Sequence, residues 1–233
     1  MHCEYTGEMT LRPLSLLELR VLGVLIEKAH TVPDSYPLSL NSLTLGCNQK
    51  TARDPVLNAS EEQVQASVDA LRALSLVFET SGSRVTRYEH NLGRALGLPS
   101  QSVALLAVLM LRGPQTGSEL RANSERLHRF ADLSSVEAFL DELAERPAEK
   151  GGALVVKLPR APGAREPRWA QLLGGPVDMS ALALTAAEVG EPDRVAAGEI
   201  AALRAQQGAM QAELAELRAL VDRLYQELGV VRS

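Results

Sequence analysis

Histidine and cysteine are the side chains that most often bind transition metals, and in this chain they show no ligand spacing. No His-x-x-x-His or Cys-x-x-Cys pair occurs. The residues concerned are His2, His30, His90, His128, Cys3 and Cys47. We therefore expect no metal site, and we interpret each cysteine as an ordinary reduced thiol.

Patterns for nucleotide binding and for acid–base catalysis are also missing. There is no Gly-x-Gly-x-x-Gly and no P-loop, and the glycine pairs 151–152 and 174–175 are typical of turns. Acidic pairs at 61–62 and 141–142 fall in expected helices, where capping or solvent exposure explains them. The sequence predicts no enzyme and no cofactor.

The side chains best suited to a ligand are basic and amide groups, which bind phosphates and base edges. One group surrounds residue 50 and continues into an expected hairpin: Asn48, Gln49, Lys50, Thr51, Arg53, Arg84 and Arg87. A second group lies farther along: Arg121, Arg126, Arg160 and Arg165. Both are candidate nucleic-acid-binding surfaces, and the alternative for each is a solvated loop.

Composition limits what can position these groups. The chain has 233 residues, of which 45% are hydrophobic and 3% aromatic, so Leu, Val and Ala must form the cores. The net charge is −5 and the acidic excess lies mainly in the tail, which counts against a strongly basic binding face. With no long apolar run and no signal-like start, we expect a cytoplasmic protein.

A three-helix unit with a hairpin is expected in the first part of the chain. Ser15 and Glu18 form a capping box for a helix to about residue 29, a short helix follows at 39–47, and Ser60 opens a third helix. Residues 76–80 and 84–89 then form a hairpin around a glycine. This order predicts a winged helix.

The same order recurs in the second part, which is the strongest architectural signal. Helices are expected at 102–112, from Thr116 to 127, and from Ser134 or Ser135, followed by a hairpin at 153–158 and 168–172. Each last strand has an Arg before an aromatic residue, 87–88 and 168–169, and we expect the ring in the core and the Arg in solvent.

The tail carries a heptad seam in which spacings of three and four residues alternate. Its members are Ile200, Leu203, Gln207, Met210, Leu214, Leu217, Val221, Leu224 and Leu228. Such a narrow apolar stripe needs a partner helix, and we expect self-association, with packing on the rest of the chain or on another protein as alternatives. Gln207 would help to fix the register.

The expected fold is mainly α with small β-hairpins: two tandem winged-helix domains plus a C-terminal coiled-coil helix. Its parts are a mobile leader at 1–13, domains at 14–97 and 98–175, a linker at 176–198 and the coiled-coil helix at 199–229.

Several separated segments resemble one bacterial family. They include Tyr36–Asn41, Cys47–Thr51, Arg84–Glu89, Leu111–Arg121 and Pro162–Trp169. Over about residues 14–178 the chain resembles the uncharacterised YceH family. The resemblance implies tandem winged helices of a kind usually associated with DNA binding, and it implies no established activity.

These observations favour a DNA-binding protein, for instance a transcriptional regulator that contacts double-stranded DNA. Two features oppose this. The expected third helices are acidic, and the stretch 48–59 is long for a helix-turn-helix. The alternative is a protein–protein interaction scaffold with winged-helix docking surfaces and a coiled-coil assembly helix.

Overall fold

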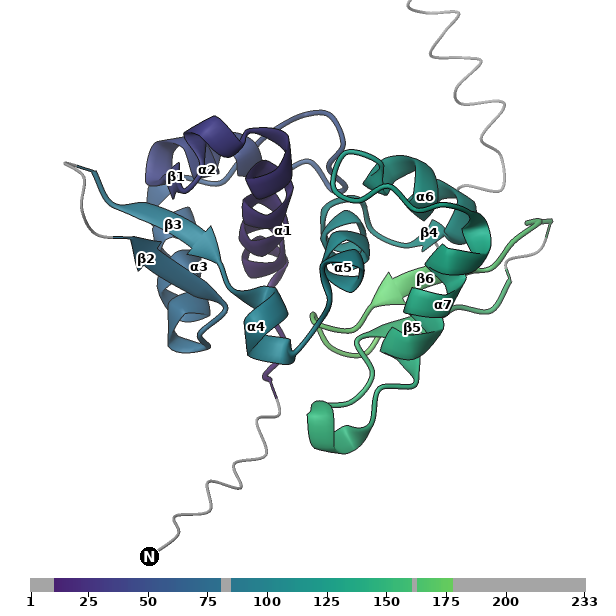
Figure 1. The fold of residues 1–233 in the computed structure, drawn as a ribbon. Coiled ribbons are helices and arrows are strands. Elements are labelled where there is room, and N and C mark those ends of the chain that lie inside the picture. The colour runs from purple at the N-terminus through teal and green to yellow at the C-terminus, as the bar shows by residue number, and fades with distance from the viewer. Residues whose placement is uncertain (1–10, 81–84, 161–162, 178–233) are drawn as a thin grey trace, which may run out of the picture. The chain divides into compact units, whose positions relative to one another are not determined.

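The structure is a computed structural model that describes residues 11–80, 85–160 and 163–177. The described chain is mixed α and β, with seven α-helices and small antiparallel sheets (Figure 1). The first repeat comprises α1 (Leu16–Thr31), β1 (Leu38–Ser39), α2 (Leu40–Cys47), α3 (Glu61–Ala73), β2 (Val77–Thr80) and β3 (Arg87–His90). The second, after α4 (Leu92–Leu96), comprises α5 (Ser100–Arg112), β4 (Gln115–Thr116), α6 (Gly117–Ser124), α7 (Leu133–Ala144), β5 (Val155–Lys157) and β6 (Arg168–Gln171).

The two sheets have the same topology and the same register. The strand orders are β1-β3-β2 and β4-β6-β5. Ser39 lies opposite Arg87 in the first sheet, and Thr116 lies opposite Arg168 in the second. The repeat expected from the order of the elements is therefore confirmed at the level of individual residue pairs.

Capping residues set the starts of the helices, mostly as expected. Ser15, Ser60 and Thr116 each accept a hydrogen bond from a backbone N–H in the first turn and complete a capping box. The prediction that Ser134 or Ser135 opens α7 is wrong. Asp132 is the N-cap, because its side chain accepts from the backbone N–H of Ser135 at 2.8 Å.

Some elements depart from the expectations. The strands β1 and β4 and the short helix α4 were not expected. Helix α6 ends at Ser124 rather than at residue 127, and the chain then turns toward α7. Helix α5 begins two residues earlier than expected, at Ser100.

In the last strand of each repeat the aromatic ring is buried, as expected. The arginine beside it was expected to point into solvent, but it also binds a backbone carbonyl. Tyr88 and Trp169 are 4% and 2% exposed. Arg87 is half-buried and donates to the Pro37 carbonyl, and Arg168 is exposed and donates to the equivalent Pro114 carbonyl. Each arginine thus ties the last strand to the segment just before the first strand.

The first helices of the two repeats pack together through a common core. Figure 1 shows α1 and α5 side by side, and a Cβ on Gly23 of α1 would lie 2.9 Å from Cγ of Leu111 in α5. The Asp54 N–H donates to the Leu111 carbonyl at 2.8 Å, and the Leu14 N–H donates to the Leu173 carbonyl at 2.8 Å. The described residues up to 177 consequently form one compact unit.

An ion pair holds the start of this unit in place, and the predicted seam lies beyond its end. Arg12, in the expected leader, pairs with Glu18 at 2.6 Å and thus belongs to the folded part. The heptad seam from Ile200 to Leu228 lies outside the described residues, so the coiled coil stays a prediction.

Candidate nucleic-acid interface

Three of the predicted contact residues around position 50 hold the connection between α2 and α3 in place. Asn48 exchanges two hydrogen bonds with the backbone of Ala59, each 2.8 Å long. The Arg53 side chain is 1% exposed and pairs with Glu27 at 2.6 Å, and it also donates to Gln49 at 2.6 Å. These polar groups are used internally and are not presented to a ligand.

The Glu27 carboxylate balances the buried Arg53 charge. Burial by itself would raise the pKa of Glu27, but the hydrogen bonds and charge of Arg53, helped by Lys28, outweigh it and lower that pKa. A second buried arginine, Arg20, donates to the Cys47 carbonyl at 3.0 Å and to the Pro55 carbonyl at 2.5 Å, and so joins the end of α2 to the middle of the connection. The long stretch that seemed unusual for a helix-turn-helix is therefore a fixed structural element.

The other candidate residues of the first repeat provide few free donors for a ligand. Lys50 is exposed. Arg84 lies outside the described residues. Arg87 donates to the Ser35 and Pro37 carbonyls at 3.3 and 2.7 Å, which leaves it partly committed to the backbone.

The second repeat presents its predicted arginines to solvent. Arg121, Arg126, Arg160 and Arg165 are all exposed. Arg121 makes one hydrogen bond, from Nη2 to the Ala131 carbonyl at 3.0 Å. Its other donors can reach a ligand.

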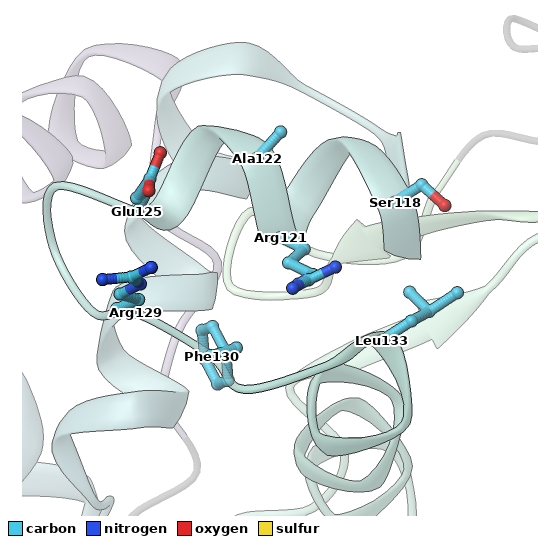
Figure 2. Close-up of a pocket in the computed structure, with 7 residues that line it drawn as sticks. All are labelled: Ser118, Arg121, Ala122, Glu125, Arg129, Phe130 and Leu133. Atoms are coloured by element: carbon cyan, nitrogen blue, oxygen red, sulfur yellow. The ribbon is translucent and has the colours of Figure 1, made fainter.

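A pocket of about 390 Å³ lies between α6, the α6–α7 connection and the start of α7. Figure 2 shows Arg121 extending from α6 toward Phe130 and Leu133, with Arg129 and Glu125 at one end of the pocket and Ser118 at the other. The Phe130 ring makes edge contacts with the rings of His128 and Phe139, at centroid distances of 4.7 and 6.0 Å.

The loop between β5 and β6 reaches the same helix. The Ser118 hydroxyl donates to Glu166 at 3.2 Å, and Arg168 pairs with Glu119 at 3.0 Å. Arg165 is adjacent to Glu166 in the chain and so lies near the start of α6. We call the exposed arginines of α6, of the α6–α7 connection and of this loop the second-repeat arginine surface: Arg121, Arg126, Arg129, Arg160 and Arg165.

Arg129 is the member of this surface that the sequence reasoning missed. It is exposed and lines the pocket together with Arg121. The sequence did hold a signal, because residues 126–129 read Arg-Leu-His-Arg, a short basic run in a loop. The signal was missed because the helix from Thr116 was expected to continue to residue 127.

The charged side chains that the third helix of each repeat exposes are mainly acidic, as the sequence indicated. The exposed acidic residues are Glu61, Glu62 and Asp69 on α3, and Glu137, Asp141, Glu142 and Glu145 at and after α7. Arg72 on α3 is engaged by Asp69 and Glu79 at 3.4 and 2.7 Å. These helix faces repel phosphate.

Neither a metal cluster nor a membrane span is present in the described part of the chain. In that part, no group of three His, Cys, Asp or Glu side chains could hold an ion, and no helix is both long and apolar enough to cross a bilayer. Burial raises the pKa of the Cys47 thiol to about 12, so this cysteine is unreactive near neutral pH.

Fold and surface together define a mixed α/β protein with an internal structural repeat and a basic surface on its second half. Residues 14–164 match the family described as "Protein of unknown function, DUF480", and the chain belongs to this family. The expectation of an uncharacterised bacterial family is confirmed, whereas the name YceH stays a prediction.

Relatives in several bacteria are similar over nearly the whole chain. A UPF0502 protein of Methylibium petroleiphilum is 66% identical over 220 residues, which cover 94% of this chain and 92% of the relative. UPF0502 proteins of Burkholderia multivorans and Leptothrix cholodnii are 61% and 60% identical, cover 91% and 97% of their own lengths, and align with 94% of this chain in each case.

Proposed function

We propose that each repeat is a winged-helix unit and that the protein binds double-stranded DNA through the second-repeat arginine surface. The observation that carries the proposal is the gathering of exposed arginines around α6. Arg121 and Arg129 line one pocket, and a hydrogen bond from Ser118 to Glu166 brings the loop that contains Arg165 to the same helix. The proposal places the protein in the bacterial cytoplasm, with its DNA.

Arginine suits this role because its guanidinium stays charged and binds phosphate oxygens with paired N–H groups. Each phosphate that a cation neutralises releases condensed counterions, which drives association. In a helix-turn-helix the helix before the reading helix crosses the DNA backbone. Helix α6 has this position in the second repeat, so Arg121 on this helix and the arginines of the connection after it would meet phosphates.

The acidic α7 sets the mode of binding. Glu137 and Asp141 are exposed on the helix that would enter the major groove. Carboxylates there are repelled by the phosphates on both sides of the groove. We therefore propose phosphate-directed binding with little sequence preference.

Fluorescence anisotropy with a labelled random-sequence duplex at low salt tests this function. The variant Arg126→Ala/Arg165→Ala removes two exposed charges of the arginine surface, outside the pocket lining. We expect binding to weaken on the order of tenfold. The matched control, Arg94→Ala/Lys150→Ala, removes the same charge from exposed positions elsewhere and should bind nearly as wild type.

The exposed acidic faces of α3 and α7 support the second candidate, a protein-interaction scaffold. If the wild-type chain fails to bind the duplex even at low salt, the DNA proposal is wrong and the scaffold remains. Under either function we propose that the C-terminal seam assembles chains into a coiled coil.

A further inference from the structure

The pocket beside α6 has a composition that phosphate binding alone does not explain. Alongside Arg121 and Arg129, its lining includes Ala122, Phe130 and Leu133. A site for a DNA backbone needs exposed cations, not an apolar floor. Small-molecule sites, in contrast, combine apolar walls with a few polar groups in volumes of about 300–1,000 Å³, and this pocket of about 390 Å³ falls in that range.

The charges of the pocket indicate the charge of its ligand. Arg121 and Arg129 contribute two positive charges and Glu125 one negative charge. Within the described residues, Arg129 forms no hydrogen bond or ion pair, so its guanidinium is available. The net charge of the lining is +1, which favours a ligand with a single negative charge.

We propose that this pocket is a binding site for a small organic monoanion, a carboxylate on an apolar or aromatic body. The carboxylate pairs with Arg129 and with the donors of Arg121 that the Ala131 carbonyl does not use. The apolar body lies against Leu133 and against Phe130, whose ring packs on His128 and Phe139. Arg121 and Arg129 also belong to the second-repeat arginine surface, but binding of the carboxylate can be measured without DNA.

An amide NMR titration without DNA tests the site, with phenylacetate as the probe. Phenylacetate has both the ring and the charge, acetate has the charge alone, and phenylethanol has the ring alone. We expect phenylacetate to shift the amide signals of Ala122, Phe130 and Leu133 with a dissociation constant on the order of 1 mM or tighter. Acetate and phenylethanol should bind more weakly.

Two arginine variants show whether the pocket or the general charge is responsible. Arg129→Ala should weaken phenylacetate binding about tenfold, because a charge-assisted pair is lost. Arg126→Ala removes a neighbouring exposed charge that does not line the pocket and should leave the affinity unchanged. Both variants should keep the thermal unfolding midpoint of the wild type, since neither side chain is buried.

Three results would overturn the proposal: no shift of the pocket amides with phenylacetate, equal binding of acetate, or equal losses in the Arg126 and Arg129 variants. All three results are measured with phenylacetate or acetate and without DNA, whereas the DNA proposal is tested by the binding of a duplex, so the two proposals can fail separately.

Discussion

Arg53 and Arg129 carry the same guanidinium group in opposite surroundings. Arg53 is buried against Glu27, and Arg129 is exposed at the pocket. The sequence distance explains why the first role was not foreseen, because Glu27 lies 26 residues before Arg53. A loop arginine that neighbours Asn, Gln and Lys in the sequence is interpreted as a ligand contact, because the sequence does not show that Glu27 pairs with it.

We expect Arg53→Ala to lower the free energy of unfolding by about 3 kcal/mol, because Glu27 is left half-buried without its cation. Urea unfolding monitored by circular dichroism measures this. Arg72→Ala, which breaks the exposed pairs with Asp69 and Glu79, should cost less than about 1 kcal/mol. Equal costs for the two variants would contradict the structural role of Arg53.

The pair of Arg53 and Glu27 makes the free energy of unfolding depend on pH. The folded-state pKa of Glu27 lies below its ordinary value, so the ionised carboxylate stabilises the fold at neutral pH. This contribution is lost as the pH falls through the folded-state pKa. Stability of the Arg53→Ala variant should therefore fall less on acidification than that of the wild type.

At the scale of elements, local signals were predictable and short or non-local ones were not. Ser15 with Glu18 and Ser60 with Gln63 are complete within four residues of sequence, so the sequence predicts the helix starts. The two-residue strands β1 and β4 have no periodicity, and they form only because the hairpin strands offer hydrogen-bond partners.

The tight packing of α1 on α5 also belongs to the scale of elements. Gly23→Ala places a Cβ against Leu111, which is 3% exposed and has little room to move. Overpacking of this kind outweighs the gain in helix propensity, and we expect a net loss of about 1 kcal/mol in the free energy of unfolding.

A double-mutant cycle in urea unfolding isolates this contact. In a Leu111→Ala background the obstructing side chain is absent, so Gly23→Ala should be neutral or stabilising there. The same loss in both backgrounds would show that the contact between α1 and α5 is not the cause.

At the scale of the whole molecule, the sequence repeat predicted the repeated topology correctly but could not show how the copies differ. In the first repeat the connection between α2 and α3 is closed by Asn48 and Arg53, and it also contacts α5. The shorter α6–α7 connection leaves a pocket and presents arginines. Candidate surfaces were thus predicted in both repeats, and among the described residues the arginines of the second are the more exposed.

The predicted seam in the tail gives an assembly test on the full chain. Leu217→Asp puts a charge into an apolar a/d position and should reduce the mass measured by light scattering toward that of one chain. Leu217→Ile keeps the position apolar and should retain the larger mass. If the wild-type chain is already monomeric, the prediction of self-association is wrong.

The salt dependence of duplex binding shows whether the second-repeat arginine surface binds the phosphates of DNA. If arginines neutralise phosphates, the logarithm of the binding constant falls linearly with the logarithm of salt concentration, with a slope of about −0.9 per phosphate contacted. The Arg126→Ala/Arg165→Ala variant should reduce the magnitude of this slope by about two, and Arg94→Ala/Lys150→Ala should leave it unchanged. A wild-type affinity that does not change with salt, or an equal reduction in both variants, would contradict DNA binding through the second-repeat arginine surface.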